Sequence, residues 1–346
     1  MRWIYLILIL SFPTAAGAQQ VRDSSPINAD RVSSLLARVR TPPVASTTIE
    51  EALQVGFDLL RVGNYDAGLA LFTAVLEVNG KDHRASYGQA LSLFNLGRPV
   101  DAERAARTAM ELSKTQPQVK YGRADALVLL AVILAVRNDN SGALRALSEA
   151  VTIAPESFDA QFALGRALYG SGDPKQAAVV FRKAIGLRPD DGKSRFFLAT
   201  ALEAAGELDE ARNTYKELIA LLPDNPAGYL GLGVLLLKFD SEKTDEGIKQ
   251  LQKAIALDEN LYEARITLGR TLIKAGRVAE AVEHLSRAAQ LAPNNPEPHY
   301  QLAIAYRRLG RIAEGEAEAA KVREINSLRR TANDSSKPKV PSQDRR

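Results

Sequence analysis

The sequence contains no cysteine, a single tryptophan and only three histidines. Without cysteine, the chain can form no disulfide, no thiolate metal site and no cysteine nucleophile. His83, His284 and His299 lie far apart with no metal-ligand spacing between them, so we interpret them as ordinary helix residues. Aromatic residues are scarce while alanine and leucine are abundant, which favours closely packed helices over a β-rich core.

Sequence motifs of catalysis are also missing. There is no phosphate-binding loop of the GxxxxGKS or GxxxxGKT kind, no HExxH zinc motif and no GxSxG nucleophile motif. Gly231-Leu232-Gly233 lies within an apolar helical stretch that no strand precedes, so we interpret it as close helix packing. We therefore expect no enzymatic activity, no cofactor and no metal site.

The excess positive charge of the chain lies near its two ends. Of the formal net charge of +4, Arg2 supplies one charge and residues 330–346 supply three, which leaves residues 19–329 neutral. A nucleic-acid-binding protein carries its basic surface on the folded domain itself. We therefore expect no nucleic-acid binding, while attachment of the basic tail to a membrane surface stays open as an alternative.

Residues 1–18 have the pattern of a secretory signal peptide. Arg2 precedes the apolar run from Trp3 to Phe12, and the small residues Ala16-Gly17-Ala18 come directly before Gln19. The run is about half the ~20 residues that a membrane span requires, so we expect cleavage rather than anchoring. The mature protein is then periplasmic or extracellular and has no integral membrane span.

Two segments flank the central part of the chain. Residues 19–48 form a predicted linker that contains a short helix between Ile27 and Val39, with one apolar face made of Val32, Leu35, Leu36 and Val39. We expect this helix to rest on the first repeat, although a separate docking motif is the alternative. Residues 330–346 are rich in serine, proline and charge, which predicts a disordered basic tail.

A period of 34 residues organises everything between these segments. Prolines recur at positions 155, 189, 223 and 293, and glycines recur at 172, 206, 276 and 310. In residues 158–191, two apolar stripes of helical spacing flank the turn Gly172-Asp173-Pro174. Asp173 is a predicted N-cap with Pro174 at the first helical position, while Gly165 leaves room for Phe181 between two close helices. Each unit is therefore a predicted helix–turn–helix hairpin.

This pattern resembles the tetratricopeptide repeat, in which a small residue follows leucine in the first helix. The eighth position of every unit is small, being Gly56, Ala90, Ala131, Gly165, Ala199, Gly233, Gly269 and Ala303. When the repeats are aligned on this small residue, the chain divides into eight units: 49–82, 83–116, 124–157, 158–191, 192–225, 226–261, 262–295 and 296–329. The usual tryptophan is absent from all of them. We expect the insertion at residues 117–123 to lengthen the first helix of the third unit.

The resemblance implies an all-α fold, a right-handed superhelical solenoid of eight repeats with a concave groove. It also implies that the second, fifth, ninth and twelfth positions of each repeat face that groove. We call these the groove positions, and the residues selected there are Leu53, Phe57, Tyr87, Leu91, Phe94, Val128, Phe162, Arg166, Tyr169, Lys193, Phe196, Arg270, Tyr300 and Arg307. Packing against neighbouring hairpins is the alternative for Phe57, for Leu91 and for Val132, which is also at a groove position.

Such a surface is typical of a non-catalytic scaffold that binds an apolar or amphipathic segment of a partner protein. With an export signal, this predicts a role in cell-envelope assembly, secretion or polysaccharide export, and a homo-oligomer is compatible with it. The alternative function is an accessory subunit that positions a catalytic partner in an envelope enzyme complex. No three successive first helices carry the Asn, Lys and Arg clamp by which some family members bind C-terminal carboxylates, so a chaperone C-terminus is not the expected ligand.

Overall fold

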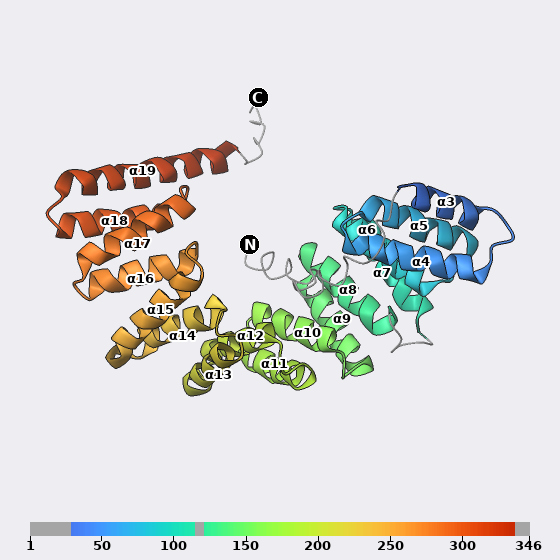
Figure 1. Ribbon diagram of the computed structural model, residues 1–346, viewed down its shortest axis with the longest axis horizontal. Helices are drawn as coiled ribbons and strands as arrows, with labels where there is room; N and C mark the ends of the chain where they lie inside the picture. The colour runs from blue at the N-terminus through green and yellow to red at the C-terminus, as the bar shows by residue number, and fades with distance from the viewer. Residues whose placement is uncertain (1–28, 115–120, 336–346) are drawn as a thin grey trace, which may run out of the picture. The chain divides into compact units, whose positions relative to one another are not determined.

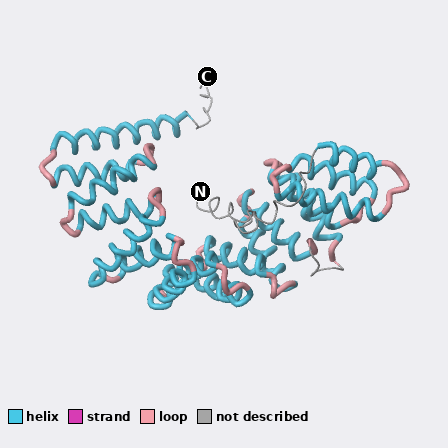
Figure 2. The backbone as a smooth tube through the Cα atoms, in the orientation of Figure 1, coloured by secondary structure: helices cyan, strands magenta, loops and turns pink. Residues whose placement is uncertain are grey.

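A computed structural model describes residues 29–114 and 121–335 of the chain. In these residues all regular secondary structure is helical and no strand occurs (Figure 2), which confirms the predicted all-α class. The predicted signal peptide at residues 1–18, and the basic tail from residue 336 onward, lie outside the described residues.

The chain divides into two compact units, residues 1–205 and 206–346, and the helices of each are labelled in Figure 1. The described helices of the first unit are α3 (Ala29–Arg40), α4 (Ser46–Arg61), α5 (Tyr65–Val78), α6 (His83–Asn95), α7 (Pro99–Leu112), α8 (Arg123–Val136), α9 (Asn140–Ile153), α10 (Phe158–Ser171), α11 (Pro174–Leu187) and α12 (Gly192–Ala205). Those of the second are α13 (Leu208–Leu221), α14 (Pro226–Phe239), the 3-10 turn η2 (Ser241–Lys243), α15 (Thr244–Leu257), α16 (Tyr262–Lys274), α17 (Val278–Leu291), α18 (Pro296–Arg308) and α19 (Ile312–Ser335).

From α4 to α19 the helices follow one another in pairs, and these pairs correspond to the eight predicted repeats. The fifth pair is divided between the units, since α12 ends the first and α13 begins the second. Within each unit the second helix of a pair packs against the first helix of the next pair, as α5 does against α6 and α15 against α16. The predicted helical solenoid is thereby confirmed.

Small residues at the eighth position of the repeat allow the two helices of a pair to approach closely. A Cβ atom on Gly56 would lie 2.8 Å from the ring of Phe72, and one on Gly165 would lie 2.8 Å from the ring of Phe181. Both rings are fully buried. The predicted packing of Phe181 beside Gly165 is therefore confirmed, and the same pairing recurs in the first repeat.

The turn between paired helices uses the left-handed backbone conformation. Gly172 has φ +89°, and the carboxylate of Asp173 then accepts a 3.1 Å hydrogen bond from the backbone N–H of Gln176, which confirms the predicted N-cap of α11. In the third repeat Asn138 occupies the place of the glycine and has φ +65°. Asparagine adopts this conformation more readily than most residues, so the turn is preserved without glycine.

The helix expected between Ile27 and Val39 is present as α3. Val32, Leu35 and Val39 are buried in one apolar cluster with residues of α4 and α5, and Leu36 packs against this cluster. The helix thus rests on the first repeat and covers apolar surface that the repeat would otherwise leave exposed.

Two segments differ from the sequence-based expectation. The insertion before the third repeat does not lengthen its first helix, because α8 begins at Arg123 after the left-handed Tyr121 and the extended Gly122. At the other end, α19 continues five residues past Arg330, where we expected the disordered tail to begin. Residues 331–335 contain neither proline nor glycine, and adding residues to an existing helix costs little free energy.

Candidate protein-binding surface

The first helices of successive pairs contact one another and so bring the groove positions of neighbouring repeats together. These contacts join α4, α6, α8, α10 and α12 in the first unit and α14, α16 and α18 in the second. In the second unit, Arg270 Nη1 on α16 lies 3.9 Å from Glu297 Oε1 on α18. Because both residues occupy groove positions, the surface is continuous from the seventh repeat to the eighth.

Part of the predicted groove set belongs to the core. Leu53 is buried in the cluster that contains Val32, Leu35 and Val39 of α3, so it is not available on an open surface. A second subset is half-buried and packs against the apolar core of α6 to α11; it consists of Tyr87, Leu91, Phe94 and Val128. Since repeats stack through the same first helices, a groove position can serve the core and the surface at once.

Tyr121 from the insertion lies against residues at the groove positions of the first two repeats. Its ring stacks on Phe57, with centroids 4.0 Å apart and planes 15° apart, and on Tyr87, with centroids 5.2 Å apart. Burial raises the pKa of the Tyr87 hydroxyl far above its ordinary value, with a smaller contribution from Asp125. Tyr121 is not among the predicted groove residues, although an aromatic residue in a polar insertion was a signal that could have revealed it.

Other groove positions carry side chains that reach solvent. Tyr300 is 54% exposed on α18, and Arg307 on the same helix and Arg270 on α16 are also exposed. We call these three residues, together with Glu297, the Tyr300 surface. In the first unit Lys193 is exposed, whereas Tyr169 and Phe196 are half-buried. The open part of the groove set therefore combines aromatic and cationic side chains, which are favoured anchors at protein interfaces.

Arg166 differs from the other cationic groove residues because it is buried. Only 4% of its surface is exposed, and its guanidinium lies 5.8 Å from the ring centroid of Phe162 and 5.5 Å from that of Phe197. Phe162 is buried as well. Burial alone lowers the pKa of Arg166 to about 10, so the group stays protonated at neutral pH.

The histidines and acidic residues do not form a metal site in the part of the chain that the structure describes. His299 Nδ1 instead lies 2.5 Å from Glu318 Oε2, a contact that joins α18 to α19 within the last hairpin. No helix among the described residues is long and apolar enough to cross a membrane.

The stacked helical pairs and their first-helix surface define a helical-repeat protein of the kind that mediates protein–protein interaction. The chain belongs to the tetratricopeptide repeat family. Models described as "Tetratricopeptide repeat" match residues 56–117, 168–235 and 238–288, and one described as "TPR repeat" matches residues 269–310. Together they cover more than half of the chain.

Solved structures support the same fold. The C-terminal part of a TPR repeat-containing protein from Cytophaga hutchinsonii aligns at 18% identity with a TM-score of 0.56, over 72% of this chain and 99% of that one. Pseudomonas aeruginosa pilF aligns at 19% identity with a TM-score of 0.51, over 62% and 97%. The APC/C hetero-tetramer Cut9–Hcn1 contains a chain that aligns at 19% identity with a TM-score of 0.51, over 86% and 55%. A search of curated proteins gave no match.

Proposed function

We propose that this protein is an exported, non-catalytic scaffold that binds an apolar or amphipathic segment of a partner protein at its groove positions. The process that it serves is cell-envelope assembly, secretion or polysaccharide export. The observation that carries the proposal is the Tyr300 surface, where an aromatic ring that is more than half exposed stands with two exposed arginines.

The apolar core of the last repeats does not include Tyr300. The core of the last repeats is filled by residues such as Leu285, Leu302 and Ala305, which are buried in one cluster. When a partner covers a large ring that is exposed to water at a groove position, the burial of its apolar surface favours binding. Arg270 and Arg307 add donors for carboxylate or carbonyl oxygens of that partner. These features suit a segment with an apolar face and acidic or carbonyl groups at its edge.

Export is supported by the charged start, the apolar run and the small residues that end at Ala18. Fractionation of the native cells with N-terminal sequencing tests it directly. We expect the mature protein to begin at Gln19 and to occur in the periplasm or the medium. A cytoplasmic protein that retains Arg2 would refute the export part of the proposal without affecting the scaffold part.

The binding part can be tested by photo-crosslinking of the full chain in its native cells. A benzophenone amino acid is placed at position 300, and the matched control is the same amino acid at position 179, because Val179 is an exposed residue on the second helix of the fourth repeat. We expect a defined adduct from position 300 alone, and a weaker adduct when Arg270→Ala and Arg307→Ala are added. Equal adducts from both positions, or none from position 300, would contradict a groove-bound partner.

The identity of the crosslinked protein then indicates which cellular process the scaffold serves. A component of outer-membrane assembly, secretion or polysaccharide export would support the proposed role. A synthase or peptidase would instead support the alternative of an accessory subunit that positions an enzyme. The comparison needs no assumption about the partner, since mass spectrometry of the adduct identifies it.

A further inference from the structure

The guanidinium of Arg166 is buried in the first unit without a counter-charge. Neither its Nε nor its Nη1 has a hydrogen-bond partner, and no acidic side chain of the described residues forms an ion pair with it. Arg265 provides a contrast, since this arginine is also buried but its Nε donates a 2.7 Å hydrogen bond to the backbone oxygen of Glu259. A buried charge with unsatisfied donors is unfavourable and is therefore uncommon in folded proteins.

An aromatic residue of the next repeat completes this environment. The sixth position varies among the repeats, from Gly88 and Gly231 to Leu129, and the fifth repeat carries Phe197 there. The ring of Phe197 stacks on Phe181 with centroids 5.7 Å apart and meets Phe162 edge-on at 5.6 Å. Arg166 therefore lies against two rings of one phenylalanine cluster.

The phenylalanine cluster extends from Arg166 to a groove position that is partly open. Phe196 is half-buried at the fifth position of its repeat, and its ring meets Phe197 edge-on with centroids 5.8 Å apart. The neighbouring groove residue Lys193 is exposed. A half-buried apolar ring, a guanidinium without an ion pair and an exposed cation are thus brought together on the neighbouring helices α10 and α12.

We propose that Arg166 and the surrounding phenylalanines form an anion subsite that binds a carboxylate carried by an apolar or aromatic stretch of the partner segment. The inference rests on the proposed function and specifies the chemistry of the ligand. A guanidinium presents parallel N–H donors that match the two oxygens of a carboxylate. Because Arg166 is buried, this pairing is stronger than on the surface, and the rings would pack against the apolar neighbours of the acidic residue.

The carboxylate can come from a glutamate or aspartate side chain or from the C-terminus of the partner. Three acetylated tripeptides separate these sources. Leu-Glu-Phe amide carries only a side-chain carboxylate, Leu-Gln-Phe with a free terminus carries only a terminal one, and Leu-Gln-Phe amide is the neutral control. Binding of each peptide to the full chain is measured by saturation-transfer NMR and by the shift of the Arg166 Nε–H resonance.

Two variants test the role of the arginine itself. Arg166→Met removes the charge and keeps an unbranched chain among the rings, while Arg145→Met is the matched control because it removes an exposed arginine from α9, the second helix of the third repeat. Circular dichroism checks that both variants remain folded. We expect at least one acidic peptide to bind the parent about tenfold more tightly than the neutral peptide does. We expect Arg166→Met to abolish this preference and Arg145→Met to retain it.

The inference is overturned if the three peptides bind equally, if none binds, or if Arg166→Met leaves the acidic preference unchanged. If Arg166→Met does not fold, Arg166→Lys decides instead, because it keeps the charge and loses the paired donors. We expect Arg166→Lys to weaken binding of the acidic peptide severalfold. An unchanged affinity would contradict a carboxylate held by two parallel N–H donors of the guanidinium. Crosslinking at position 300 that succeeds while this test fails would leave the scaffold function intact without an acidic ligand.

Discussion

Phe181 on α11 fills the space that Gly165 leaves open on α10, where a Cβ atom would lie 2.8 Å from Phe181 Cε1. The ring is fully buried and also stacks on Phe197, so it cannot move aside freely. We therefore expect Gly165→Ala to lower the free energy of unfolding by about 1–3 kcal/mol through overpacking. Urea unfolding followed by far-ultraviolet circular dichroism measures the change.

The matched control for this substitution is Gly186→Ala on α11. No atom lies within 4 Å of the Cβ that the substitution would add, so alanine costs no contact and improves helix propensity. We expect a change between zero and a gain of about 1 kcal/mol. Equal destabilisation by the two substitutions would contradict the steric explanation for Gly165.

The 34-residue pattern made the hairpins, their turns and their close helix contacts predictable, because each depends on residues within one repeat. Gly165 with Phe181, and Asp173 with the N–H of Gln176, are such local pairs. The exposure of the groove positions was not predictable in the same way. It depends on neighbours outside the repeat pattern, such as Tyr121 from an insertion, or on residues at variable positions of the repeat, such as Phe197.

The turn of the third repeat predicts a substitution that stabilises the protein. Asn138 has φ +65°, whereas the corresponding turns of six other repeats place glycine at φ values from +73° to +89°. Because glycine adopts this conformation at no steric cost, we expect Asn138→Gly to raise the free energy of unfolding by about 0.5–1 kcal/mol. Thermal unfolding of the variant and the parent in the same buffer checks the gain.

Gly172→Ala is the opposite substitution and serves as its control. Nothing lies within 4 Å of the Cβ that it adds, so any loss reports backbone conformation alone. We expect a loss of about 1–2 kcal/mol. An unchanged midpoint for both variants would show that the left-handed turns contribute nothing to stability.

Stacking of Tyr121 on Phe57 and Tyr87 fixes the end of the insertion against the first two repeats. We expect Tyr121→Ala to lower the free energy of unfolding by about 0.5–1.5 kcal/mol for the aromatic contacts, in addition to the lost burial of the ring. Tyr121→Phe keeps the ring and should remain close to the parent. Urea unfolding of the parent and the two variants measures these differences. A Tyr121→Phe variant as unstable as Tyr121→Ala would show that the hydroxyl, and not the stacking, supplies the stability.

The last hairpin predicts a pH dependence through Glu318 on α19. Burial raises the pKa of this carboxyl, but the hydrogen bonds from Lys321 and His299 outweigh it, so the pKa lies below its ordinary value of 4.5. A carboxyl with a depressed pKa stabilises the folded state above its unfolded pKa, and this stability is lost as the pH falls through the folded value. We therefore expect the parent to lose stability as the pH is lowered from about 5 to about 3.

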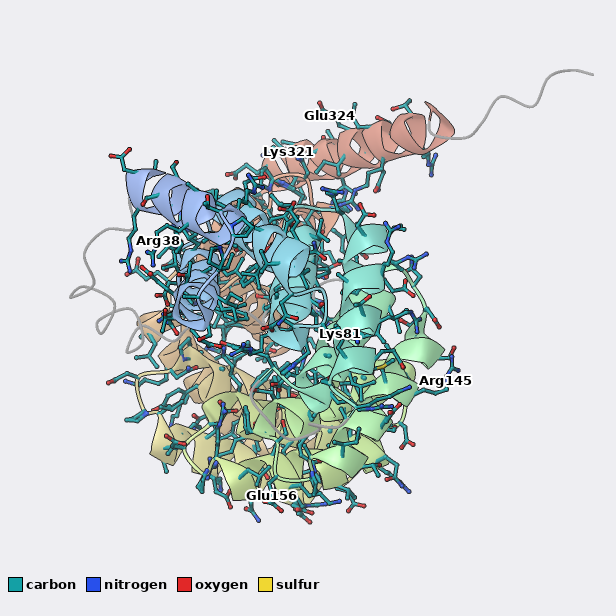
Figure 3. The ribbon with its side chains drawn as sticks, turned by 90° about the vertical axis from the view of Figure 1, so that its right-hand side faces the viewer. Arg38, Lys81, Arg145, Glu156, Lys321 and Glu324 are labelled. Atoms are coloured by element: carbon teal, nitrogen blue, oxygen red, sulfur yellow. The ribbon has the colours of Figure 1, made fainter. Side chains whose placement is uncertain are left out.

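Glu318→Gln removes the titrating group and tests this dependence. We expect the variant to lose about 1–3 kcal/mol at pH 7, because the contact with His299 loses its charge, and to show a flatter stability curve below pH 5. Glu324→Gln is the control, since Glu324 is exposed on the same helix and projects from α19 near Lys321 (Figure 3). Its stability curve should follow that of the parent. Urea midpoints of the three proteins are measured across this pH range. If the midpoints of the Glu318 variant and of the parent fall in parallel, the assignment is contradicted, because other carboxyl groups then account for the lost stability.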